Sequence, residues 1–248
     1  MARGEGIDLT EERIRAGRRW LAVGLAGYGF MLAGAGVFAG LVEGHDSMEY
    51  APLVIVTWLQ LATCAVVVPL WVCGEGAGGL GGVALRIVSL VAVGLAGLFV
   101  TTAVAGEGGW GEALLLEGLV GSFAVGSAGV STLVLAAVRR VAAAQILASV
   151  VLLGLLALPM LANPVITWVT PAHRRLAIDC TSYSSALVVT AYAAEMDFYR
   201  GPGMYEWSVA GDYAFSVPRP LTASLLYLGT GLLLVAVFRP LRPRLMRR

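Results

Sequence analysis

Residues 113–161 read ALLLEGLVGSFAVGSAGVSTLVLAAVRRVAAAQILASVVLLGLLALPML. Two long apolar runs are separated here only by Arg139-Arg140. A helix needs about 20 apolar residues to cross the hydrocarbon core of a bilayer. The stretch therefore predicts two transmembrane helices joined by a tight, charged turn.

The composition of the whole chain extends this prediction to an all-α, polytopic membrane protein. The 248 residues are 58% apolar and only 13% charged, whereas a soluble domain usually carries about 25% charged residues. We expect one transmembrane domain over residues 1–248, without a separate soluble domain. Six predicted spans cover Trp20–Val42, Ala51–Val72, Val83–Ala105, Ala113–Val138, Val141–Leu161 and Leu221–Phe238.

The placement of arginine predicts the orientation. Thirteen of the 17 basic residues, all of them arginine, fall in the leader, in alternate turns and in the tail 239–248. Arginine-rich segments stay in the cytoplasm. We therefore expect a multi-pass protein of a bacterial cytoplasmic (inner) membrane, with both termini in the cytoplasm.

Two segments outside the spans have a membrane-surface character. Residues 1–19 predict a short interfacial helix on the cytoplasmic side, with Thr10 as its cap. Residues 163–220 connect spans five and six on the outer side and are too apolar for a plain loop. Tyr and Trp favour the interface. We expect one or two short interfacial or re-entrant helices there.

Several chemistries are disfavoured by residue types. The absence of lysine excludes a P-loop and a lysine Schiff base. The cysteines Cys64, Cys73 and Cys180 lack metal-ligand spacing. The two histidines, His45 and His173, lie on the predicted outer side, where they cannot hold a haem between spans. We expect no cofactor, no metal site, no nucleic-acid partner and no catalytic residues.

Three polar residues fall inside predicted spans. Glu117 lies about one turn inside the fourth span, Gln60 near the middle of the second, and Gln145 near the inner end of the fifth. Intramembrane carboxylates are costly and often mark a polar path. The three residues are candidates for a substrate path, with interhelical hydrogen bonds as the alternative for the glutamines and interfacial exposure for Glu117.

Small residues spaced four apart share one helix face and allow close helix packing. Gly36 and Gly40 form such a pair in the first span, and Gly118, Ser122 and Gly126 form a row in the fourth. Both sets predict packing within the bundle or a subunit interface.

The layout resembles the membrane subunit of type-two ATP-binding-cassette transporters. Two stretches carry the likeness: AVAGEGGWGEALLLEGLVGS, residues 103–122, and GSAGVSTLVLAAVRRVAAAQILASVVLLGLLALPMLANP, residues 126–164. The family has an interfacial N-terminal helix, six spans, and short re-entrant helices between spans five and six. The stretch between spans two and three, WVCGEGAGGLGGVALR (71–86), is shorter than in the family.

The resemblance implies a permease subunit that is not itself an enzyme. It would form a homo- or heterodimer in the lipid bilayer and work with a separate ATP-binding subunit. Candidate docking residues for that subunit are Glu75, Arg86, Arg139 and Arg140. Two alternatives remain open: a non-transporting scaffold or assembly subunit of a larger membrane complex, and a membrane-embedded enzyme.

Overall fold

The computed structural model describes Tyr28, Gly29, Leu32 and residues 52–74, 80–105, 109–138, 140–161, 163–196, 198, 216 and 218–241. Within these residues the chain is helical and has no strand. Four helices are long and apolar enough to cross a membrane, which supports the predicted all-α membrane fold. They are α2 (Pro52–Gly74), α3 (Leu80–Ala105), α4 (Trp110–Ala137) and α11 (Pro220–Phe238).

The bounds of these four helices lie within a few residues of the predicted spans two, three, four and six. Of the predicted first span, only Tyr28, Gly29 and Leu32 belong to the described part of the chain. The predicted leader helix, residues 1–19, and the tail beyond residue 241 lie outside it. The number of six spans therefore stays a prediction.

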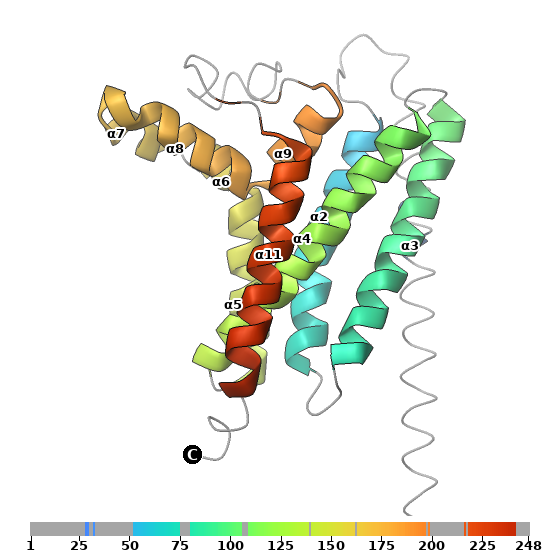
Figure 1. The fold of residues 1–248 in the computed structure, drawn as a ribbon, viewed down its shortest axis with the longest axis vertical. Helices are drawn as coiled ribbons and strands as arrows, with labels where there is room; N and C mark the ends of the chain where they lie inside the picture. The colour runs from blue at the N-terminus through green and yellow to red at the C-terminus, as the bar shows by residue number, and fades with distance from the viewer. Residues whose placement is uncertain are drawn as a thin grey trace, which may run out of the picture.

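Helix α4 lies at the centre of the bundle. It packs against α2, α3 and α11, and also against the shorter helices α5 (Val141–Leu156) and α9 (Ala186–Ala193). Figure 1 shows α2, α3, α4, α5 and α11 running alternately up and down. We call the end where α2, α4 and α11 finish the arginine end, and the opposite end the α8 end.

The fifth helix is shorter than predicted. It ends at Leu156 rather than Leu161, and a four-residue helix, α6 (Leu158–Leu161), follows after a turn at Ala157. Pro159 explains the break, because proline has no backbone N–H and its ring clashes with the carbonyl four residues earlier. With 16 residues, α5 is shorter than a usual transmembrane helix.

The predicted outer segment contains three short helices, α7 (Asn163–Trp168), α8 (Pro171–Ser184) and α9. Figure 1 shows α6, α7 and α8 extending sideways from the bundle at the α8 end. Thr170 precedes Pro171 at the start of α8, a favoured place for proline. Trp168 and Leu176 are strongly exposed on these helices.

Helix α9 is held against the bundle by hydrogen bonds from two directions. The Ser185 hydroxyl donates to the carbonyl of Leu156 over 2.7 Å, at the end of α5. The Trp58 indole N–H of α2 lies 3.2 Å from the carbonyl of Leu187 and 3.1 Å from Thr190 Oγ1. These contacts fix α9 between α2 and the end of α5.

We expect Trp58→Phe to lower the free energy of unfolding by about 1 kcal/mol, the usual net value of an intramolecular hydrogen bond. The variant keeps the aromatic ring but loses the indole N–H. Denaturant unfolding in mixed micelles would measure the change. Trp110→Phe is the control, because the Trp110 ring is 60% exposed and contacts Phe99 through its edge. Equal stability of both variants would contradict a stabilising hydrogen bond from the Trp58 indole to α9.

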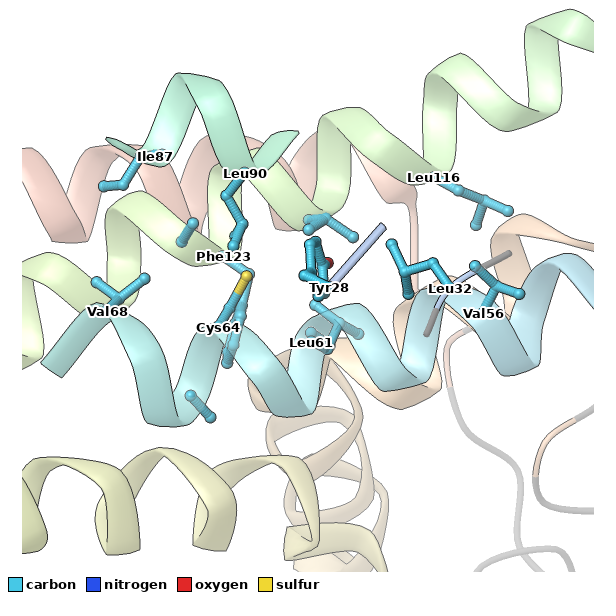
Figure 2. Packing of buried hydrophobic residues seen from close by; sticks show 14 of the residues in the cluster. Tyr28, Leu32, Val56, Leu61, Cys64, Val68, Ile87, Leu90, Leu116 and Phe123 are labelled. Atoms are coloured by element: carbon cyan, nitrogen blue, oxygen red, sulfur yellow. The ribbon is translucent and has the colours of Figure 1, made fainter. Parts of the chain in front are cut away.

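The main apolar core lies between α2, α3 and α4 and includes the described residues of the first predicted span. Tyr28 and Leu32 are buried there beside Leu61, Cys64 and Leu116. Figure 2 shows these labelled side chains filling the space next to α2. Tyr28 and Leu32 therefore belong to the core of the bundle.

Helices α4 and α11 come into backbone contact through two glycines. A Cβ built on Gly129 would lie 2.6 Å from Gly231 Cα. A Cβ built on Gly231 would lie 2.7 Å from the carbonyl carbon of Val125 and 2.8 Å from Gly126 N. The helices can approach this closely only because neither position carries a side chain.

Candidate functional site

Glu117 is a buried acid near the α8 end of α4. It lies about 10 Å along the helix from Trp110, at 1.5 Å rise per residue. Its side chain is only 3% exposed and faces the interior of the bundle. The structure therefore disfavours the alternative in which Glu117 reaches the membrane surface.

The Glu117 carboxyl meets Gln60 of α2 beside Gly94 of α3. A Cβ on Gly94 would lie 2.7 Å from Glu117 Oε1, 2.8 Å from Gln60 Nε2 and 2.9 Å from Glu117 Oε2. The absence of a side chain at Gly94 thus leaves the space that both polar groups occupy. Residues of the three helices α2, α3 and α4 therefore meet at this contact.

Tyr28 and Cys64 lie close to the same acid. The Tyr28 hydroxyl and the Cys64 thiol are both near enough to Glu117 for electrostatic interaction. Cys64 lies one turn after Gln60 on α2, on the same helix face. We call Tyr28, Gln60 and Glu117 the polar cluster.

The polar cluster contains unpaired hydrogen-bonding groups. Among the described residues, five buried side-chain nitrogen or oxygen atoms lack a hydrogen-bond partner: Tyr28 Oη, Gln60 Nε2, Gln60 Oε1, Glu117 Oε1 and Glu117 Oε2. Gln60 and Glu117 are close enough to interact, but their geometry does not meet that of a hydrogen bond. A buried polar group without a partner costs about 1–3 kcal/mol. Such a concentration within an apolar bundle suggests a functional site.

No basic side chain of the described residues lies beside the polar cluster. In the described part of α3, the basic residue Arg86 lies about 12 Å from Gly94 along the helix, toward the arginine end. Its guanidinium is placed over the Trp71 ring, 6.0 Å from the ring centroid. An ionised Glu117 would therefore have no described basic side chain beside it.

Gln145, the third predicted polar residue, lies away from the polar cluster. Its Nε2 donates to the carbonyl of Leu70 over 3.4 Å and so joins α5 to the last turn of α2. This geometry favours the interhelical hydrogen bond over a substrate path for Gln145.

The predicted row of small residues in α4 does not pack as a whole on one neighbouring helix of the described chain. Gly118 is exposed with no atom near its Cβ position, and Ser122 donates to the carbonyl of Gly118 in its own helix. Only Gly126 packs closely on α11, with its Cβ position 3.3 Å from the carbonyl oxygen of Tyr227. Gly36 and Gly40 lie outside the described residues.

The candidate docking residues lie at or near the arginine end where they are described. Arg140 is exposed just before α5, and Arg86 is partly buried near the start of α3. Glu75 and Arg139 lie outside the described residues.

A groove between α2, α5 and α9 is the other candidate site. It has a volume of about 350 Å³ and apolar walls that include Trp58, Leu59, Leu156, Met160 and Leu187. Its chemistry suits an apolar chain rather than a polar ligand. In the described part of the chain, no group of three or more His, Cys, Asp or Glu side chains could hold a metal ion.

No protein-family model, curated protein or solved structure matches this chain. The site therefore has to be interpreted from its own geometry. Sequence reasoning identified Glu117 and Gln60 separately but missed Gly94, Tyr28 and Cys64. The spacing of Gln60 and Cys64 by one helical turn was the available signal for a shared face.

Proposed function

We propose that the chain is the permease subunit of an ATP-binding-cassette-type transporter, with ATP hydrolysis on a separate subunit. The observation that supports it most is the order of helices after α5. A shortened apolar helix is followed by the short helices α6 to α9 at one end, and then by a return span, α11. This order agrees with the layout of the membrane subunits of type-two ATP-binding-cassette transporters, which the sequence resembles.

The arginine end carries exposed basic residues that fit this proposal. Arg140 and Arg239 are exposed at the arginine end, which the distribution of arginine predicts to be cytoplasmic. A basic surface on that side suits docking of a soluble ATPase through acidic groups. Rim charges of this kind affect the rate and specificity of association.

The outer surface of α11 suits lipid or a second membrane subunit. Its exposed apolar side chains are Leu221, Leu225, Leu226, Leu232, Leu233 and Val237. The face toward α4 is packed, so this surface is free for contacts outside the described bundle. A dimer of such subunits would provide the substrate path.

We expect a P-loop ATPase to co-purify stoichiometrically with the full chain from its native membrane in mild detergent. Quantitative mass spectrometry of the bound proteins would measure it. Arg140→Glu reverses a charge at the arginine end and should reduce recovery of the ATPase about tenfold, a loss of about 1.4 kcal/mol.

Arg175→Glu is the matched control, because the Arg175 side chain is 67% exposed on α8, at the opposite end. It should retain the ATPase. Recovery of other membrane proteins without any ATPase would contradict the permease proposal and favour a scaffold subunit. Equal loss in both variants would contradict docking at Arg140.

A further inference from the structure

We propose that Glu117 is a proton-binding site, which takes up and releases one proton within the polar cluster. The inference concerns one chain and does not depend on an ATPase partner. It rests on the meeting of Glu117 and Gln60 at Gly94, on their burial, and on the absence of hydrogen-bond partners for both side chains.

A proton completes the hydrogen bonding that the two side chains lack. A protonated carboxyl has one O–H donor and one free acceptor oxygen, and a glutamine amide has both donors and an acceptor. With small side-chain rotations, Glu117 can donate to Gln60 Oε1 while Gln60 Nε2 donates to the other carboxyl oxygen. An ionised Glu117 only accepts, so it can accept from Gln60 Nε2 but cannot donate to Gln60 Oε1.

The charge balance of the step is simple. A proton from water forms an O–H bond with one carboxylate oxygen, and the net charge of the polar cluster changes from −1 to zero. Release returns the proton to water and restores the charge. A charge in the membrane interior is costly unless it is paired. The protonated and the ionised carboxyl therefore favour different surroundings. Binding of the proton would thus change how the helices around Glu117 pack.

Among the described residues, the groups near Glu117 supply no competing charge. Gln60 of α2 meets Glu117 beside Gly94 of α3, and Tyr28 and Cys64 lie near enough for electrostatic interaction. The described residues of α5, α9 and α11 that pack on α4 include no acidic or basic side chain at this level. Tyr183 and Tyr227 form a separate contact, in which the Tyr227 hydroxyl donates to the carbonyl of Tyr183 over 2.9 Å.

A metal ion fits the polar cluster less well than a proton. The four oxygens available are two from Glu117, one from Gln60 and one from Tyr28, whereas calcium takes about 6–8 oxygens and magnesium about six. The space at Gly94 is already occupied by the ends of Glu117 and Gln60, at 2.7–2.9 Å from the Cβ position. A proton needs no additional volume.

Infrared difference spectroscopy of the purified full chain in lipid would test the proposal. We expect a carboxylic-acid C=O stretching band that is lost as the pH rises and that shifts when water is replaced by heavy water. Glu117→Gln should abolish this band. Glu112→Gln should retain it, because Glu112 is only partly buried in the first turn of the same helix.

Each other outcome would overturn the proposal. A band that survives in Glu117→Gln belongs to another acid. A Glu117 band that neither titrates nor shifts in heavy water means a fixed structural proton. A band that disappears on addition of Na⁺ at constant pH means that a metal ion occupies the site. If Glu117→Gln fails to fold, Glu117→Asp supplies the assignment, because the titrating band should change frequency rather than disappear.

Discussion

Replacing Gly231 with alanine should lower the free energy of unfolding by about 3 kcal/mol, the upper end of the usual cost of overpacking a core. The added methyl group would contact the carbonyl oxygen of Val125 and lie 2.8 Å from Gly126 N. Both are backbone atoms of α4, so no side chain can rotate away. The helices α4 and α11 would have to separate along their whole contact.

Reversible denaturation in mixed micelles would measure this effect. Gly229→Ala is the matched control, because Gly229 belongs to the same helix and has no atom within 4 Å of its Cβ position. It should be neutral or stabilising by about 0.5–1 kcal/mol, the usual gain of alanine over glycine in a helix. The same sign of change at both positions would contradict the close contact of α4 with α11.

Gly94→Ala should lower the free energy of unfolding by about 2 kcal/mol, within the range for an overpacked site. The methyl group would take the space that the Glu117 carboxyl and the Gln60 amide now share. These groups end flexible side chains and can move, so the effect should be smaller than at Gly231. Moving them apart would also prevent their pairing.

A double-mutant cycle with Glu117→Ala tests this explanation. Removal of the carboxyl leaves room for the methyl group, so Gly94→Ala should cost less in that background. Contacting residues typically show coupling of about 0.5–3 kcal/mol. Gly81→Ala, in the same helix with open space around it, is the control and should show no coupling. Additive effects of Gly94→Ala and Glu117→Ala would contradict the shared site.

Apolar run length predicted α2, α3, α4 and α11, because a membrane fixes the length of a crossing helix. The same rule failed at the end of α5. There Pro159 interrupts an apolar run that still reads as one span, and local backbone chemistry outweighs hydropathy. The proline was visible in the sequence, so this break was predictable from residue type.

The candidate site was only half predictable. Burial of a carboxylate in an apolar span identified Glu117 from sequence, but its partners depend on how three helices are rotated and shifted against each other. The row of Gly118, Ser122 and Gly126 shows the same limit. Its spacing is regular, yet the close contact at Gly129 is made with Gly231, about 100 residues away along the chain. The spacing of residues within one helix shows which of them share a face. It does not show which other helix packs against that face.

The glycine contact between α4 and α11 has a consequence for the newly made chain. Residues 138–219 lie between α4 and α11 in the sequence. During synthesis, the face of α4 that carries Gly129 therefore stays without its partner helix in the bilayer until residues 138–219 and α11 have been made. Lipid would cover this face in the meantime, and α11 would displace the lipid when it packs on α4.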